Sequence, residues 1–261
     1  NDGKVDEVNT HSSGNNQLRV MKNTSTPGSV SFAAPAVFTP ANPFSSAHKI
    51  YAVDFDGDGL KDLLLGNPAN ILINTSSGGT LSFVNFNYNN NPLSPGLTQN
   101  CGASTLTLTC TGSHFTIADL NGDSKMDIIL TWCGGVGRNC AFINNTIGGV
   151  LGFVYNNGNV GDSNGPMIGP TSGAVPAVAD FNKDGKPDIV ITGHTGTSCS
   201  GVGNTKVWRN NIEASNIAFI NDPGADLYGS NAGCNPANAP SLLAYYPGHE
   251  PIIADFDGDG E

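Results

Sequence analysis

The side chains that could do chemistry lie in an acidic nine-residue motif that recurs along the chain. Three complete copies span Asp54–Asp62, Asp119–Asp127 and Asp180–Asp188, and they follow the pattern Asp-x-Asp/Asn-x-Asp-Gly-x-x-Asp. Carboxylates at the first, third and fifth positions repel one another unless a cation lies among them. Oxygen ligands at this spacing suit Ca²⁺, and the glycine at the sixth position allows a sharp turn. The motif therefore predicts calcium loops.

In each loop we expect side chains at positions one, three, five and nine, and the backbone carbonyl at position seven, to bind the ion. The predicted ligands are Asp54, Asp56, Asp58, Leu60 (backbone) and Asp62; Asp119, Asn121, Asp123, Lys125 (backbone) and Asp127; and Asp180, Asn182, Asp184, Lys186 (backbone) and Asp188. Two partial sites near the chain ends offer Asp255, Asp257 and Asp259, and Asp2 and Asp6. Ser124 replaces the glycine of the second loop, so we expect a strained turn and a weaker site there.

An EF-hand is the main rival, and the sequence argues against it. An EF-hand loop needs Glu at position 12, where this chain has Leu65, Leu130 and Ile191. A metal-free acidic turn is the other alternative. One such turn is ordinary, but five copies in register favour metal. Three divalent ions would also reduce the net charge from −11 to −5, so the ions are expected to hold the turns together.

The motif belongs to a longer repeat with four short apolar runs in each unit. One run precedes the loop, a second follows it, a third ends at Asn23, Asn74, Asn144 or Asn210, and a fourth ends at Phe32, Phe83, Phe153 or Phe219. Four short strands per unit are typical of β-propeller blades. We therefore predict an all-β fold of about four four-stranded blades. The predicted units cover roughly 1–53, 54–118, 119–179 and 180–254, with 255–261 starting a further repeat.

Over essentially the whole chain, this pattern resembles the FG-GAP (VCBS-type) repeats. These are the calcium-loop blades of integrin α-subunit propellers, some fungal lectins and many secreted bacterial proteins. The resemblance rests on the three complete loops, with Ser124 as the one departure. It implies a calcium-stabilised propeller that binds other molecules or is fused to other domains. Both ends lie inside a loop motif, so we expect the chain to be part of a larger propeller or repeat array.

Six cysteines lie in polar loops, which favours disulfides and an oxidising, extracellular compartment. We predict the pairs Cys101–Cys110, Cys133–Cys140 and Cys199–Cys234, one of fifteen possible pairings, with reduced thiols as the alternative. The sequence contains no Cys-x-x-Cys pair, so we do not expect a zinc site. Asn23, Asn74 and Asn144 begin Asn-x-Ser/Thr sequons, so glycosylation is possible there, and turn geometry is the alternative reason for these asparagines.

Several function classes fit the composition poorly. A net charge of −11 disfavours nucleic acid, and no apolar stretch approaches the roughly 20 residues of a membrane span. No catalytic motif appears, so we predict that the chain is not an enzyme. Binding is expected in the long loops. The candidate ligand-contact aromatics, with blade packing as the alternative role, are Trp132, Trp208, Tyr245 and Tyr246.

The sequence thus predicts a non-catalytic, extracellular calcium-binding propeller that mediates adhesion or recognises a glycan or a cell-surface protein. The first alternative is a structural repeat unit of a cell-surface fibre or large adhesin, in which neighbouring copies would be the partners. A non-catalytic domain of a secreted enzyme is the second alternative.

Overall fold

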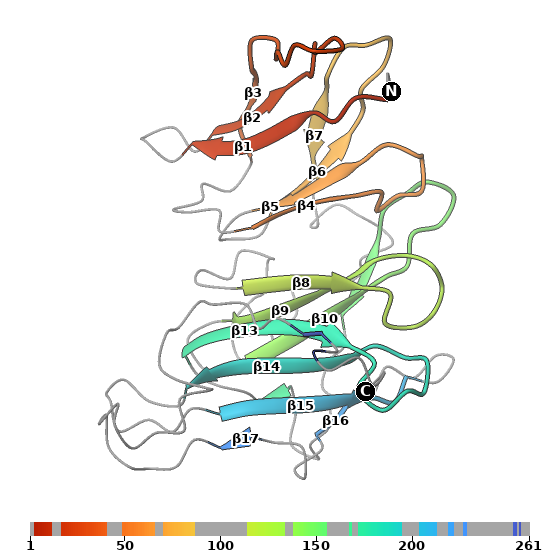
Figure 1. Ribbon diagram of the computed structural model, residues 1–261. Coiled ribbons are helices and arrows are strands. Elements are labelled where there is room, and N and C mark those ends of the chain that lie inside the picture. Colours follow the sequence, from red (N-terminus) through yellow and green to blue (C-terminus); the bar gives the residue numbers. More distant parts are fainter. Residues whose placement is uncertain are drawn as a thin grey trace, which may run out of the picture. The chain divides into compact units, whose positions relative to one another are not determined.

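The chain folds into antiparallel β-sheets, as the computed structural model shows (Figure 1). The described residues contain four sheets and no helix. The predicted all-β class is therefore confirmed. No membrane-spanning helix is present among these residues. The structure describes residues 3–11, 17–40, 49–65, 70–86, 114–133, 138–155, 167–168, 172–194, 204–212, 219–221, 227–228, 253–254 and 256.

The chain divides into two compact units, and the first, Asn1–Asn87, holds two sheets. The first sheet has the order β1-β2-β3, and the second has the order β4-β5-β6-β7, so neighbours in sequence are neighbours in the sheet. The strands are β1 (Glu7–His11), β2 (Gln17–Met21), β3 (Ala36–Phe38), β4 (Ile50–Val53), β5 (Asp62–Leu65), β6 (Asn70–Asn74) and β7 (Phe83–Asn85).

The second unit, Tyr88–Glu261, also holds two sheets, each with four strands in sequence order and one short added strand. In the first of them β12 pairs with β10, and in the second β17 pairs with β15. The strands of the first sheet are β8 (His114–Ala118), β9 (Asp127–Cys133), β10 (Arg138–Asn144), β11 (Phe153–Tyr155) and β12 (Met167–Ile168). Those of the second are β13 (Ser172–Ala179), β14 (Asp188–His194), β15 (Asn204–Asn210), β16 (Phe219–Asn221) and β17 (Leu227–Tyr228).

Each complete acidic loop connects the first two strands of its sheet. The last residue of the first strand pairs with the ninth residue of the loop, as in Val53 with Asp62, Ala118 with Asp127 and Ala179 with Asp188. The sheets therefore begin one strand before the loops at which the predicted blade units begin. The meander of four strands is consistent with propeller blades, while the unit boundaries themselves stay a prediction.

The second strand of each sheet with a complete loop is buried on both faces at residues 62–65, 127–131 and 188–191, while Thr192 is partly exposed. Leu63, Leu64 and Leu65 in β5 are at most 2% exposed. In the second unit β13 lies beside β8 and β9 (Figure 1), and one apolar cluster joins the two sheets. That cluster includes Ile129, Ile189 and Trp208. Burial of this apolar surface, at about 25 cal/mol per Å², is the main force that holds the sheets together.

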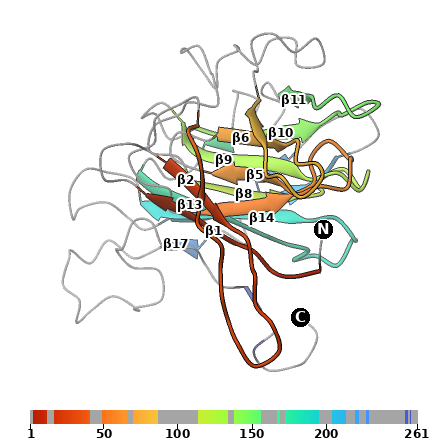
Figure 2. The ribbon, with the colours of Figure 1, turned by 90° about the horizontal axis from the view of Figure 1, so that it is seen from above.

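The fourth strand differs from the prediction. The sequence predicts a run that ends at phenylalanine, but in three repeats the strand begins there, at Phe83, Phe153 and Phe219. Before Phe83 the chain forms a hairpin instead, since Ser77 and Thr80 exchange backbone hydrogen bonds of 3.2 and 2.9 Å. In the first repeat, β3 starts later still, and the chain between β2 and β3 extends beyond the sheet (Figure 2).

Candidate metal centre

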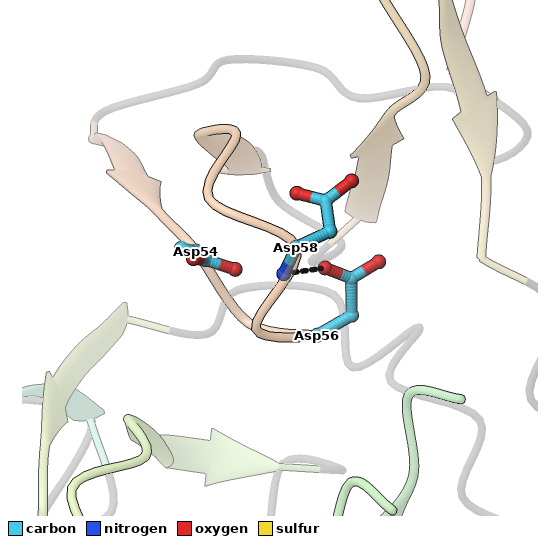
Figure 3. Close-up of side chains that lie close together, drawn as sticks. All are labelled: Asp54, Asp56 and Asp58. Carbon is cyan, nitrogen blue, oxygen red and sulfur yellow. Dashed lines mark hydrogen bonds between the residues drawn. The ribbon is translucent and has the colours of Figure 1, made fainter. Parts of the chain in front are cut away.

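The loop between β4 and β5 gathers three carboxylates on one turn (Figure 3). One carboxylate oxygen from each of Asp54, Asp56 and Asp58 lies within 4.8 Å of the other two. Backbone N–H groups hold them there: Gly57 and Gly59 donate to the two oxygens of Asp54 at 2.7 and 2.9 Å. Asp56 accepts from the Asp58 amide at 3.1 Å, the bond drawn in Figure 3. The turn thus gathers carboxylate oxygens, a type of ligand that suits Ca²⁺, close to one another.

The loop after β8 has the same internal hydrogen bonds. Asp119 accepts from the Gly122 and Ser124 amides, both at 2.8 Å. Asn121 accepts from the Asp123 amide at 3.1 Å, and Asp123 in turn accepts from the Lys125 amide at 3.0 Å. Asn121 therefore takes the same place as Asp56 in the first loop and keeps an oxygen there with no charge.

In the loop after β13, Asp180 accepts from the Gly185 amide at 2.8 Å, and Asn182 accepts from the Asp184 amide at 3.0 Å. The Asn182 side-chain amide also donates to Asp184 at 3.0 Å. That bond lowers the pKa of Asp184, with a smaller contribution from the Lys186 amide. In the first loop the pKa of Asp56 is raised instead, mainly by burial and in part by Asp58 and Asp54.

Two positions of each loop adopt the left-handed backbone conformation. At the sixth position φ is +88° for Gly59, +67° for Ser124 and +84° for Gly185, so the strain expected at Ser124 has a structural basis. The sequence motif does not predict the same conformation at the fourth position. There Lys183 has φ +58°, at the place that Gly57, with φ +81°, fills in the first loop. A non-glycine residue in this conformation costs about 1–2 kcal/mol.

The ninth-position aspartates form the buried base of each loop. Asp62, Asp127 and Asp188 are at most 1% exposed. Asp62 accepts from the Phe55 amide and from the Asn74 amide, both at 2.8 Å, so its two oxygens face backbone N–H groups. The group of three carboxylates within 4.8 Å of one another does not include Asp62, and its role as a ninth-position ligand stays a prediction. Burial raises the pKa of Asp62 to about 6 and that of Asp127 to about 7, although the two N–H bonds oppose the rise in each case. Burial also raises the pKa of Asp188.

An asparagine near the end of the third strand closes each loop, a role that neither the sequon nor turn geometry predicts. In the first complete loop, the Asn74 side-chain amide donates to the Lys61 carbonyl at 2.9 Å, and its oxygen accepts from the Ser76 amide at 3.0 Å. Asn23, Asn144 and Asn210 make the corresponding bonds, the last two from 1% exposed positions. Asn210 does not begin a sequon but makes these bonds too, which favours the structural reason for asparagine here.

Only some of the other predicted site residues lie in the described part of the chain. Asp6 accepts from the Asn23 amide at 2.9 Å, as a ninth-position aspartate does, while Asp2, Asp255, Asp257 and Asp259 lie outside the described residues. Trp208 is 2% exposed in the core, which favours blade packing over ligand contact. The Trp132 side chain, Tyr245 and Tyr246 lie outside the described part.

The three disulfides stay predictions. Cys101, Cys110, Cys199 and Cys234 lie outside the described residues, as do the side chains of Cys133 and Cys140. The backbone alone places these last two in neighbouring strands, with Cys133 opposite Arg138 and Cys140 opposite Leu130.

The fold and the loops define a class of all-β repeat proteins in which an acidic turn joins the first two strands of a sheet. Comparison with family models is consistent with this: residues 1–65 match an FG-GAP-like repeat, and residues 172–208 match an FG-GAP repeat. The chain therefore contains FG-GAP-type repeats. Neither match includes residues 119–127, yet in that loop, as in the other two, the first aspartate accepts from the sixth-position amide and the fifth-position aspartate accepts from the seventh-position amide. Comparison with curated proteins and with solved structures found no match.

FG-GAP repeats are generally structural or adhesion domains, not enzymes, and they usually occur in extracellular or cell-surface proteins.

Proposed function

We propose that this chain is an extracellular, non-catalytic calcium-binding module that mediates adhesion through a glycan or a cell-surface protein. The observation that carries the proposal is the oxygen-donor turn, built by the same hydrogen bonds after β4, β8 and β13. In the first of these turns, three carboxylates lie within 4.8 Å of one another, an arrangement that a divalent cation would stabilise.

The residues fit a hard cation because every side chain that they offer is a carboxylate or an amide oxygen. Asp54, Asp56 and Asp58 would hold an ion in the first loop, together with the Leu60 carbonyl. Asp119, Asn121, Asp123 and the Lys125 carbonyl, and Asp180, Asn182, Asp184 and the Lys186 carbonyl, would do so in the others. The ion would supply positive charge that offsets the repulsion within each turn.

The three ninth-position aspartates, Asp62, Asp127 and Asp188, would complete the ligand sets of their loops. Each is buried beside its turn and accepts two backbone N–H groups, so its orientation is set before the ion arrives. Calcium would then fix the connection between the first two strands of a sheet. A sheet with fixed connections provides a rigid scaffold from which long surface loops can bind a partner.

A calcium titration of the 261-residue chain tests the metal part of this proposal. We expect binding by calorimetry and a higher Tm in millimolar Ca²⁺ than in EDTA. The matched variants are Asp54→Ala, which removes a loop carboxylate, and Glu7→Ala, which removes an exposed carboxylate outside the loops. Only the first should reduce the number of calcium sites. A Tm that is equal in Ca²⁺ and EDTA, with no heat of binding, would refute the calcium proposal.

A glycan array and a cell-surface protein screen, each run in Ca²⁺ and in EDTA, test the recognition part. Retention of a sugar or protein that is lost in EDTA is the expected result. Calcium binding without any retained ligand would contradict the recognition role. Calcium-dependent association of the chain with itself would then support the structural role instead.

A further inference from the structure

Asn210, at the end of β15, contacts two acidic loops at once. Its side-chain amide donates to the Pro187 carbonyl, in its own loop, at 3.0 Å. The same amide donates to the Leu120 carbonyl at 2.8 Å, and Leu120 is the second residue of the loop that precedes it along the chain. An amide NH₂ group has two hydrogens, so both are used. Asn210 is 1% exposed, and its side chain therefore links the two loops without intervening solvent.

These contacts complete a buried path between two ninth-position aspartates. At one end, the Asn210 backbone amide donates to Asp188 at 2.7 Å. At the other end, the Leu120 amide donates to Asp127 at 2.7 Å. Asp127, Asp188, Asn210 and Leu120 are each at most 1% exposed, and β13 packs beside β8 and β9 (Figure 1). The two loops are thus held by one network of hydrogen bonds that water does not screen.

We infer that Asn210 is a positioning residue that couples calcium binding at the loops 119–127 and 180–188. The inference rests on the proposed calcium function. An ion in the loop 180–188 fixes the segment that carries the Pro187 carbonyl and Asp188, and these fix Asn210. Asn210 then holds the Leu120 peptide, so the loop 119–127 loses less conformational entropy when it binds its own ion. The coupling acts equally in the reverse direction.

Asn74 provides a matched comparison in the first unit. Its backbone amide donates to Asp62 at 2.8 Å, and its side-chain amide donates to the Lys61 carbonyl at 2.9 Å. Among the described residues, Asn74 reaches its own loop only. Asn74→Ala should therefore disturb one loop, whereas Asn210→Ala should disturb one loop and also separate it from a second.

The test is a set of calcium titrations by calorimetry on the full chain, in a background where Asp56→Ala disables the loop 54–62. Asp123→Ala then disables the loop 119–127, and the Kd of the loop 180–188 is compared with and without it. We expect Asp123→Ala to weaken that site by about fivefold or more. With Asn210→Ala also present, the effect of Asp123→Ala should disappear, and with Asn74→Ala it should persist.

Two outcomes overturn the inference. The first is a Kd for the loop 180–188 that does not respond to Asp123→Ala while Asn210 is intact; this arm needs no substitution at Asn210, so it holds even if Asn210→Ala fails to fold. The second is an effect of Asp123→Ala that is the same with and without Asn210. The absence of any calcium binding in the unsubstituted chain is a distinct result, because it would refute the proposed function itself.

Discussion

The loops 54–62 and 180–188 have the same buried base, which is the aspartate at the ninth position. They differ in the rim, by which we mean the side chains at the first, third and fifth positions. In both, a buried aspartate at the ninth position accepts two backbone N–H groups, from Phe55 and Asn74 in one and from Phe181 and Asn210 in the other. At the third position, however, one loop has Asp56 and the other has Asn182. The pKa of Asp56 is raised, mainly by burial, while the Asn182 amide lowers the pKa of Asp184.

The difference shows that the backbone conformation of the loop does not depend on the charge of the side chain at the third position. An asparagine accepts the same hydrogen bond as the aspartate at this position, 3.0 Å in one loop and 3.1 Å in the other. The charge at the rim can therefore vary between repeats and set the affinity for an ion, while the base keeps the turn in place. Four predictions test this division.

The largest effect is expected at the base, where the two loops should behave alike. Asp62→Ala and Asp188→Ala each leave two N–H groups without their acceptor, and we expect each to lower the free energy of unfolding by about 2–5 kcal/mol. Urea denaturation in EDTA measures this without any contribution from calcium. Asp58→Ala, at an exposed rim position, is the control and should cost much less. Very different losses at Asp62 and Asp188 would show that the bases are not equivalent.

The second prediction exchanges the charge at the rim. Asp56→Asn removes a carboxylate from the loop 54–62, and Asn182→Asp adds one to the loop 180–188. We expect the first to weaken calcium binding at its loop about tenfold and the second to strengthen it by a similar factor, because each charge changes the attraction for the ion by about 1 kcal/mol or more. Calorimetric titration measures both. Equal affinities before and after the exchange would mean that rim charge does not set affinity.

The third prediction concerns the fourth position, where the backbone is left-handed in both loops. Gly57→Lys places a side chain at φ +81°, and open space surrounds its Cβ, so the cost is conformational. We expect a loss of about 1 kcal/mol in the free energy of unfolding. Lys183→Gly should leave stability unchanged or raise it slightly, because relief of strain is offset by the greater freedom of glycine in the unfolded chain. Chemical denaturation of both variants would show whether the costs are reciprocal.

The smallest effect concerns the pH dependence of stability, which should have opposite signs with and without calcium. In EDTA, burial raises the pKa of Asp62 from 3.8 to about 6, so this group stabilises the folded state fully below about pH 3.8. That contribution is lost as the pH rises through about 6, and a similar loss at Asp127 follows near pH 7. Asp184, whose pKa is lowered, has the opposite effect on stability in the loop 180–188. Its contribution is present above about pH 3.8 and is lost as the pH falls through the lowered pKa.

We therefore expect the calcium-free protein to be less stable at pH 7.5 than at pH 5.5. In saturating Ca²⁺ the order should reverse, because the ion binds ionised carboxylates and competes with protons. Thermal melts at the two pH values, with Ca²⁺ and with EDTA, check this. The same pH dependence in both conditions would contradict the assignment of these carboxylates to a calcium site.

Much of the fold could be predicted because its signals are local. The motif from Asp54 to Asp62 lies between two apolar runs, and these runs do pair, with Val53 opposite Asp62. The fourth strand was misplaced because the run Leu81-Ser82-Phe83 has the same composition in a strand and in a hairpin arm. The Gly78-Gly79 turn, with φ of +56° and +79°, places Ser82 in the hairpin and begins β7 at Phe83.

The site was predicted less completely than the fold. Spacing along the chain brought Asp54, Asp56 and Asp58 together, as expected for residues of one turn. It did not show that Asp62 turns its oxygens to backbone amides, since one of those donors, Asn74, lies 12 residues further along the chain. It also did not show the left-handed backbone at Lys183, where the motif has glycine in the other complete loops.

From the sequence follow the repeat, the all-β class and the oxygen-rich turns, because each depends on residues within a few positions of one another. The tertiary fold decides which of these groups are buried and which loops communicate. Trp208 lies in the core because two sheets pack over it. Asn210 reaches Leu120, 90 positions away in the sequence, because the packing of β13 beside β8 brings the Asn210 side-chain amide within hydrogen-bond distance of the Leu120 carbonyl. No periodicity or spacing encodes such a contact, since it depends on how whole sheets pack.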